Sequence, residues 1–539
     1  MRGWMMGGVL GVSLALAGCA GGGDGRTVFV PAAASSGPVV AASPAETYAV
    51  PIPSAQIDAA IAKLDDIAAD VMRRSNVPGM AVAVVKDGRT VYAKGFGVRR
   101  IGEPEAVDAD TVFQLASMSK PIGATVVAGL VGQGTVSWDT PVATVLPWFK
   151  LSDDWITQQV TIGDFYAHRS GLADHVGDQL EDLGYDRSQV LQRLRYVPLK
   201  GFRTQYEYTN FGLTAGAEAA ATAAGLDWAT LSERTLYQPL GMTSTSSRFA
   251  DFMQHSNRAS PHVKRDGRYQ ALYQRQPDAQ SPAGGVSSSV NDVAHWMTLV
   301  LQNGTYGGRP VVKAEALLPA ISPQMVSTPP ANSNARASFY GYGFGVGTSA
   351  SGRVKLSHSG AFLLGAGTSF SMIPSAGVAI VALTNAAPVG AAEAVIATFE
   401  DLVEFGQVTR DWYPAYESRM RGLYALEGSL VGQSPPAQPV APLGSNAYTG
   451  TFTNNHYGNA VVETSGSGLV LKMGPGGAKT FALRHWSGNT YVFDLSGENA
   501  EVGSVSRIDF RPGVSGLSES LQIEYYAQDI AAGVFTRVP

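Results

Sequence analysis

Two groups of strand-like segments lie far apart in this sequence, and they constrain the fold more than any other feature. Runs of apolar residues predict strands at 80–85 and 90–98, joined by the Asp87-Gly88 pair that is typical of a tight hairpin. The second group predicts strands at 340–346, 354–358, 368–373 and 377–384. The segment between the groups, roughly 115–305, is mainly helical in pattern. We therefore expect an α/β (α+β) fold, in which one antiparallel sheet is built from both ends of the domain and flanked by helices.

Helical spacing of apolar residues also predicts helices at 54–76 and 389–405, so a first domain covers 54–405. Residues 406–444 include a stretch rich in Pro, Gly and Ser and are expected to be a linker. After it, short β-type runs recur with turns between them, which predicts a small all-β barrel or sandwich over 445–539. The runs are 450–453, 460–463, 469–472, 481–484, 491–494, 507–510, 521–525 and 534–537.

The composition excludes several functions. The chain has 539 residues, of which 45% are hydrophobic and 15% charged, so it is globular and long enough for two domains. The net charge of −5 argues against a nucleic-acid partner, because such proteins carry an excess of basic residues. With one cysteine, the chain has neither an intramolecular disulfide nor a cysteine-based zinc or iron–sulfur centre.

That cysteine, Cys19, ends an apolar run that begins near the N-terminus. Arg2 precedes the run, which extends over residues 5–17 and is too short for a permanent membrane span. Residues 1–19 therefore predict a cleaved signal peptide. The string LAGC resembles a bacterial lipoprotein cleavage box, which implies lipid on Cys19 and membrane anchoring through it. The alternative is an ordinary signal peptide that contains a cysteine. Residues 20–53 are then a flexible tether.

In lipoproteins of Gram-negative bacteria, a residue other than Asp directly after the cysteine is typical of proteins delivered to the outer membrane. In this sequence Ala20 follows the cysteine. The resemblance implies an exported protein of the cell envelope that faces the periplasm.

The sequence lacks several common catalytic signatures. It has no G-x-S-x-G, no H-E-x-x-H and no G-x-x-x-x-G-K-[ST]. The first absence argues against the usual α/β-hydrolase, the second against a zincin and the third against a P-loop NTPase.

A serine and a lysine three residues apart are the first candidates for chemistry. Ser117 and Lys120 share one face at the start of a predicted helix, where the helix dipole favours a developing negative charge. A serine hydroxyl is a poor nucleophile until a base takes its proton, and a lysine of lowered pKa is such a base. Alone, the pattern arises easily by chance, and a helix start with a solvated lysine is the alternative.

Two more short motifs follow along the chain. In Tyr208-Thr-Asn210, the phenol is able to relay a proton beside the nucleophile and the amide is able to contact a substrate carbonyl. In His358-Ser359-Gly360, glycine on a strand allows a substrate backbone to approach closely. The backbone N–H groups of Ser117 and Ala361 would then form an oxyanion hole. Each motif alone is equally consistent with a structural role.

The three motifs, in this order, resemble the serine β-lactamase and penicillin-binding-protein superfamily, particularly its class C-like branch with D-aminopeptidases, DD-carboxypeptidases and esterases. Further motifs typical of the branch lie at 76–79, 167–172, 239–242, 282–285 and 340–344. The resemblance covers 54–405. The segment 445–539 resembles the lipocalin-like barrel of some peptidases of this group, with a weak match at His485-Trp486.

The resemblance implies the β-lactamase-like sheet and a role for each site residue. Ser117 is the nucleophile that becomes acylated. Lys120 and Tyr208 act together as general acid and general base, and the resemblance does not decide which of the two is the base. Asn210 positions the substrate, and His358, Ser359 and Gly360 line the opposite wall. No metal and no cofactor are implied.

One departure bears on the substrate. Class C β-lactamases have a lysine where His358 stands, and a histidine is only partly charged at neutral pH. This favours a peptidase or amidase on short, D-residue-containing or linearised cyclic peptides. A carboxylesterase or a β-lactamase on the same machinery is the alternative, and a peptidoglycan-peptide binding protein is the non-enzymatic one. The choice between aminopeptidase and carboxypeptidase, the role of the barrel and the oligomeric state stay open.

Overall fold

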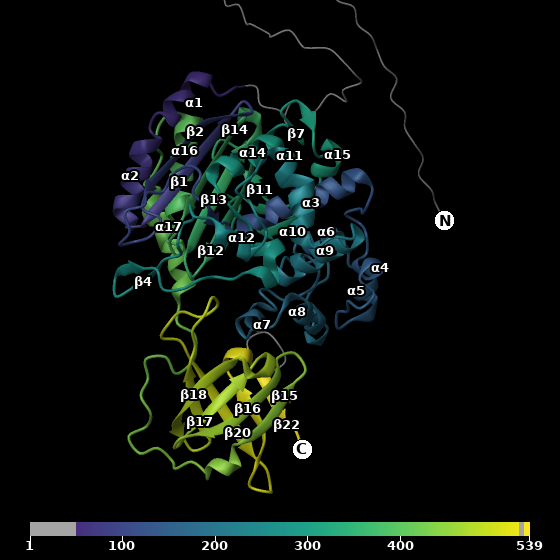
Figure 1. Ribbon diagram of the computed structural model, residues 1–539, viewed down its shortest axis with the longest axis vertical. Coiled ribbons are helices and arrows are strands. Elements are labelled where there is room, and N and C mark those ends of the chain that lie inside the picture. Colours follow the sequence, from purple (N-terminus) through teal and green to yellow (C-terminus); the bar gives the residue numbers. More distant parts are fainter. Residues whose placement is uncertain (1–49, 528–532) are drawn as a thin grey trace, which may run out of the picture. The chain divides into compact units, whose positions relative to one another are not determined.

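The computed structural model of the chain describes residues 50–527 and 533–539 (Figure 1). Cys19, the expected signal peptide and all but the last residues of the expected tether lie outside the described residues. Within the described part, none of the helices combines the length and the apolar character that crossing a bilayer requires.

The first domain is organised around one eight-stranded sheet in the order β2-β1-β14-β13-β12-β11-β10-β9. Every neighbouring pair is antiparallel. The strands are β1 (Gly79–Lys86), β2 (Arg89–Gly97), β9 (Met325–Thr328), β10 (Ser338–Tyr340), β11 (Gly345–Thr348), β12 (Val354–Phe362), β13 (Ala366–Ile373) and β14 (Val378–Thr384). Because Met80 of β1 pairs with Thr384 of β14, the two distant ends of the domain meet inside the sheet, one strand in from its β2 edge. The expected two-ended antiparallel sheet is confirmed.

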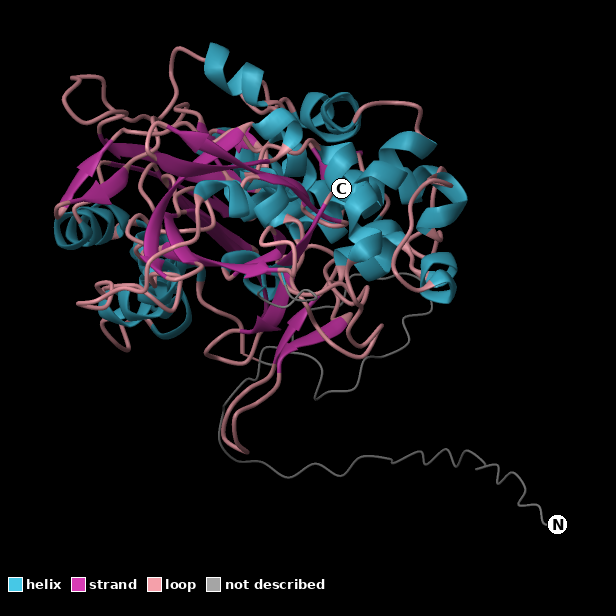
Figure 2. Cartoon of the chain, turned by 90° about the horizontal axis from the view of Figure 1, so that it is seen from below, coloured by secondary structure: helices cyan, strands magenta, loops and turns pink. Residues whose placement is uncertain are grey.

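Helices cover both faces of this sheet (Figure 2). Successive residues of a strand point to opposite faces, so β1, which is apolar at almost every position, contributes to two cores. Ala81, Ala83 and Val85 join the core that also includes residues of α3 (Ser119–Gln133) and α14 (Val290–Leu301). Met80, Val82 and Val84 join the core under α1 (Ser54–Ile61), α2 (Leu64–Ser75) and α16 (Ala391–Phe405).

Two predicted elements are divided in the structure. The single helix expected over 54–76 is two helices, α1 and α2, separated at Ala62 and Lys63. The apolar spacing continues across the break, so periodicity alone does not reveal it. The strand expected over 340–346 is also two strands, because Gly343 has a φ of 77° in a turn between β10 and β11.

The C-terminal domain is a closed barrel in which eight strands pair in sequence order. The strands are β15 (Gly450–Asn454), β16 (Gly458–Ser465), β17 (Gly468–Met473), β18 (Lys479–Ser487), β19 (Thr490–Asp494), β20 (Val505–Pro512), β21 (Ser518–Ile523) and β22 (Val534–Arg537). Pairing of β15 with β22 closes the barrel. Phe452, Leu471 and Phe535 are fully buried in its core. The expected all-β barrel is confirmed.

The segment 406–444, expected as a linker, is structured at its start. It contains α17 (Trp412–Met420), which packs on α16. Asp401 of α16 explains the attachment, because its Oδ2 accepts hydrogen bonds from the Thr409 amide at 2.7 Å and from Trp412 Nε1 at 2.7 Å. Residues 425–444 contain neither a helix nor a strand and fit the expectation.

Candidate active site

Ser117 lies on a short 3₁₀ turn, Ala116–Met118, directly before α3. Ala116 has a φ of 48°, in the left-handed region that costs a residue with a side chain roughly 1–3 kcal/mol. The neighbouring backbone holds it there. Ser119 Oγ donates to the Ala116 carbonyl at 2.6 Å, and Thr368 Oγ1 of β13 donates to the Leu115 carbonyl at 2.7 Å. The turn is therefore fixed between α3 and the sheet, and Ser117 is partly exposed on it.

Lys120, one turn further along α3, is fully buried. Its Nζ lies 3.0 Å from Ser117 Oγ, 2.7 Å from Asn210 Oδ1 and 3.0 Å from the carbonyl oxygen of Ala283. Burial lowers the pKa of Lys120 to about 7, and the charge of Asp178 acts in the opposite direction. The 282–285 motif thus supplies Ala283 as a fixed acceptor for the amine.

Tyr208 and Asn210 reach Ser117 and Lys120 from the start of α9 (Asn210–Ala223). The Tyr208 hydroxyl donates to Ser117 Oγ at 2.9 Å, and Lys120 Nζ lies 4.5 Å from the centre of the Tyr208 ring. Burial raises the pKa of Tyr208 well above its usual value. The ring of His168, which is fully buried, packs against Tyr208 with 4.5 Å between centroids. The phenol is therefore held in place and stays protonated at neutral pH.

His358 lies on β12, and the centre of its ring is 6.4 Å from that of Tyr208. Its Nδ1 is 2.7 Å from the Ser359 carbonyl, and its Nε2 is 2.8 Å from the Tyr340 hydroxyl. The carbonyl only accepts, so Nδ1 carries the proton and Nε2 accepts from Tyr340. Burial lowers the pKa of His358 to about 3, and the charge of Lys120 acts in the same direction. The partial charge expected at this position is therefore absent at neutral pH.

The backbone of β12 passes directly beside Ser117. A Cβ atom added to Gly360 would lie 3.1 Å from the Ser117 nitrogen and would overlap the carbonyl oxygen of Leu115 and Oγ1 of Thr368. This close approach gives the reason for glycine at position 360. Ala361, the next residue of β12 and the one whose amide is expected in the oxyanion hole, lines the same cleft as Ser117.

The structure adds residues that the motif analysis did not assign to the site. Asp178 Oδ2 accepts from Asn210 Nδ2 at 2.9 Å and lies 2.9 Å from Nδ1 of His175. His168 and Tyr340 belong to the 167–172 and 340–344 motifs. The sequence therefore marks them as typical of the family but does not predict that they lie beside Tyr208 and His358. Asp178 and Glu393 belong to no motif, and the sequence offered no signal for either.

A cleft of about 610 Å³ lies beside Ser117, and His175, Asp178 and Glu393 are among the residues that line it. Ser117, Tyr208, Asn210 and Ser359 line it, together with Glu498, Asn499 and Tyr525 of the C-terminal domain. Glu498 accepts from the Leu363 amide at 2.8 Å, next to the end of β12. Asn499 Nδ2 donates to the Asp178 carbonyl at 3.2 Å. Residues of the barrel domain thus form part of the wall of the cleft.

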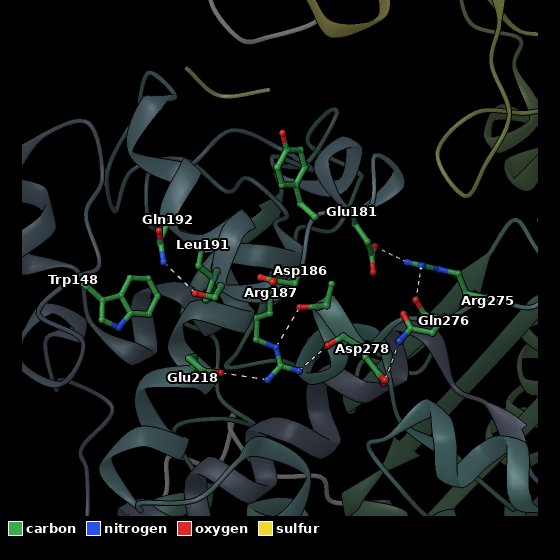
Figure 3. Close-up of a pocket in the computed structure, with 14 residues that line it drawn as sticks. Trp148, Glu181, Asp186, Arg187, Leu191, Gln192, Glu218, Arg275, Gln276 and Asp278 are labelled. Atoms are coloured by element: carbon green, nitrogen blue, oxygen red, sulfur yellow. Dashed lines mark hydrogen bonds and ion pairs between the residues drawn. The ribbon is translucent and has the colours of Figure 1, made fainter. Parts of the chain in front are cut away.

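A second cavity, of about 810 Å³, shares Arg275 with the cleft (Figure 3). Its central cation, Arg187, is occupied by protein acceptors, with Nη2 at 2.8 Å from the Asp278 carbonyl and Nη1 at 3.3 Å from Glu218 Oε2. Trp148 lines the same cavity and is 39% exposed. Around both cavities, the described residues form no cluster of three or more side chains suited to hold a metal ion.

The fold and the residues around Ser117 define a serine hydrolase, and comparison with known proteins supports this. The model of the family described as Beta-lactamase matches residues 64–405, so the chain belongs to the β-lactamase family. A second model, described as Domain of unknown function (DUF3471), matches residues 434–533.

Two characterised relatives are named as hydrolases. The unguisins hydrolase ungD' of Aspergillus campestris is 26% identical over 414 residues, which are 73% of this chain and 76% of the relative. The esterase EstB of Burkholderia gladioli is 31% identical over 231 residues, which are 38% of this chain and 57% of the esterase. Among solved structures, an octameric penicillin-binding protein homologue from Pyrococcus abyssi aligns with a TM-score of 0.55 at 18% identity. It covers 88% of this chain and 100% of its own, and it shows the fold alone.

Proposed function

We propose that this chain is a peptidase or amidase that forms an acyl-enzyme on Ser117 and acts on short peptides with D-residues or on linearised cyclic peptides. The observation that carries the proposal is the position of Lys120 Nζ and Tyr208 Oη, at 3.0 Å and 2.9 Å from Ser117 Oγ. A buried amine and a fixed phenol at these distances are what activation of a serine requires.

The hydrogen bonds of Lys120 support its assignment as the base. Two of its three contacts, Asn210 Oδ1 and the Ala283 carbonyl, only accept. A neutral amine has two protons and one lone pair, so it donates to these two oxygens and directs the lone pair to Ser117 Oγ. Tyr208 donates to the same Oγ from the other side. The serine proton therefore points to Lys120, and Tyr208 acts as an acid.

The proposed acylation follows from this arrangement. Ser117 Oγ bonds to the substrate carbonyl carbon while its proton passes to Lys120 Nζ. The carbonyl electron pair moves onto oxygen, where the amides of Ser117 and Ala361 stabilise the negative charge. When the carbonyl forms again, the C–N bond breaks, and the leaving nitrogen takes a proton from Tyr208, which Lys120 restores. Water then cleaves the ester by the same route.

The neutral state of His358 supports a peptidase or amidase over a β-lactamase. A β-lactam carries a carboxylate, and recognition of a carboxylate favours a fixed positive charge. His358 at a pKa of about 3 supplies none. A carboxylesterase stays the alternative, because esters need the same nucleophile and base, and the experiment below separates the two.

The pH dependence of acylation tests the role of Lys120. Because the base acts as a neutral amine, kcat/KM for a neutral nitrophenyl ester is expected to rise with pH through about 7, falling about tenfold per pH unit below that value. The measurement is kcat/KM from about pH 5 to about pH 9, with a stability control at each pH. A profile that is flat or that falls as the pH rises contradicts the assignment.

Acyl transfer itself is tested with a fluorophosphonate and a substrate panel. The reagent is expected to add one adduct mass to the wild type and none to Ser117→Ala. The panel has D-residue peptide anilides, nitrophenyl butyrate and a chromogenic cephalosporin, and we expect hydrolysis of the anilides by the wild type alone. Cleavage of the ester alone identifies a carboxylesterase. Full activity in Ser117→Ala would remove the nucleophile assignment.

We also propose that the enzyme is exported and anchored by lipid on Cys19, which would place it in the cell envelope close to cell-wall peptides. The LAGC string is the support for this proposal.

A further inference from the structure

The lining of the cleft has more acidic than basic side chains. Among the described residues that line it, Arg275 is the one Lys or Arg, whereas five side chains are carboxyls. The five are Asp174, Asp178, Glu393, Glu427 and Glu498. Glu498 adds little fixed charge to this excess, because burial raises its pKa to about 8, but the other four carboxyls still outnumber the cations of the lining and favour a cationic ligand.

Arg275 does not offset this excess toward a ligand, because its charge is already paired. Its Nη2 lies 2.6 Å from Glu181 Oε2 (Figure 3). Its Nε lies 3.7 Å from Glu498 Oε2. The side chain is 7% exposed. His175, the other basic group facing the cleft, is bonded to Asp178, and His358 is neutral.

Glu393 is a buried carboxyl in this cleft with no cation beside it. It lies in the first turn of α16 and is 9% exposed. Among the described residues it forms no ion pair with a Lys, Arg or His side chain. Ser359, which is next to Gly360 on β12, lines the same cleft, and its Oγ donates to Ser369 Oγ at 3.2 Å. Burial raises the pKa of Glu393, as expected for a carboxyl that lacks a counterion.

Asp178 supplies an independent sign that a ligand group is missing. Its Oδ2 serves both Asn210 and His175, but its Oδ1 is buried and has no hydrogen-bond partner. The residue is 4% exposed and lines the cleft. Buried carboxyl oxygens are nearly always satisfied in folded proteins. A donor that enters with the substrate would satisfy this one.

We propose that the substrate carries a primary ammonium group into the cleft and that Glu393 is the residue that selects it, with Asp178 as a second acceptor. This rests on the proposed function and deepens it. The substrate class becomes short peptides or amides with a free amine near the scissile carbonyl. An ammonium group matches the chemistry of both carboxyls, because it has three donors and a charge opposite to that of an ionised carboxylate.

Three anilides that share one leaving group test the proposal and separate the two sources of an amine. They are a D-alanyl, an N-acetyl-D-alanyl and an N-acetyl-D-lysyl anilide. We expect the wild type to prefer a free-amine substrate over N-acetyl-D-alanyl anilide by about tenfold or more in kcat/KM, as a charge-assisted hydrogen bond implies. A preference for the D-alanyl anilide identifies the α-amine, and a preference for the lysyl anilide identifies a side-chain amine.

Glu393→Gln keeps the size and hydrogen-bonding capacity of the side chain and removes its charge. We expect it to reduce the preference for the free amine by about tenfold. Glu404→Gln is the matched control, because Glu404 is also on α16 but bonds the Ser351 amide and hydroxyl at 3.1 Å and 2.8 Å and does not line the cleft. Its preference is expected to equal that of the wild type.

The proposal is overturned if the wild type cleaves N-acetyl-D-alanyl anilide as fast as, or faster than, both substrates that carry a free amine. It is also overturned if a folded Glu393→Gln keeps the wild-type preference. Loss of the preference in Glu404→Gln as well would also count against it. If no anilide is cut but the fluorophosphonate labels Ser117, ligand protection replaces turnover as the measurement. D-alanine amide is then expected to slow labelling of Ser117 more than N-acetyl-D-alanine amide does, and equal protection by the two overturns the proposal. Absence of any Ser117-dependent reaction is instead a failure of the proposed function.

Discussion

Lys120→Met is expected to reduce kcat/KM by about 10⁴-fold or more, close to the loss that removal of Ser117 itself would cause. Residues that activate a nucleophile act as a unit with it, so removing the base costs nearly as much as removing the nucleophile. In this protein the loss is expected to be severe, because Lys120 Nζ is the one amine in contact with Ser117 Oγ among the described residues. Methionine fills a similar volume without a proton acceptor. The measurement is single-turnover acylation by a nitrophenyl ester.

A lysine at full burial normally weakens a fold, so Lys120→Met is expected to unfold at the same temperature as the wild type or a higher one. Thermal unfolding followed by circular dichroism is the control. Lys120→Arg is the second comparison, because arginine keeps a positive charge but does not act as a base near neutral pH. Activity of Lys120→Met within tenfold of the wild type would show that Tyr208 or water takes the serine proton instead.

Gly360→Ala is expected to reduce kcat/KM by about 10²-fold to 10³-fold, the range for loss of an oxyanion-hole donor. The added methyl group would overlap the Leu115 carbonyl oxygen and lie 3.1 Å from the Ser117 nitrogen. Backbone atoms on both sides leave little room for relaxation, so β12 or the turn that carries Ser117 must move. Either movement separates the amides of Ser117 and Ala361. The loss is expected mainly in kcat, because the amides act on charge that develops in the transition state.

Gly347→Ala on the neighbouring strand β11 is the matched control, since a Cβ atom there meets nothing within 4 Å. It makes the same chemical change in the same sheet and is expected to leave kcat/KM at the wild-type value. A Gly360→Ala variant with wild-type kcat would show that the approach of β12 to Ser117 has no part in the reaction.

Much of the fold follows from features that a sequence expresses locally. The strands at both ends of the first domain are runs of apolar residues bounded by turns, and helices between them leave one antiparallel sheet as the simple solution. The barrel strands are short and evenly spaced, so all eight are found. Breaks inside a continuous pattern are different. Nothing in the apolar spacing marks Ala62 and Lys63 as the end of a helix, and the left-handed φ of Ala116 has no sequence signature.

The residues of the site also divide into those that a local sequence pattern predicts and those that it does not. Ser117 and Lys120 lie at the start of one helix, so helical spacing predicts their contact. The order of the three motifs along the chain predicts Tyr208, Asn210 and His358 as further site residues. The carboxyls that line the cleft come from separate elements. Asp178 begins a short helix, Glu393 lies in the first turn of α16, and Glu498 lies in a barrel loop. Their convergence depends on tertiary packing, which no local pattern encodes.

The pairing of β1 with β14 has a consequence for how the chain reaches its native state. Partners in this pair, such as Met80 and Thr384, are separated by about 300 residues, so β1 and β2 cannot join the rest of the sheet until nearly the whole first domain has been synthesised. The barrel strands instead pair mostly with their immediate neighbours in sequence. Long loops must be closed before such distant contacts contribute, and this slows folding. The rate-limiting search therefore belongs to the domain that carries Ser117, and the nucleophile is assembled late.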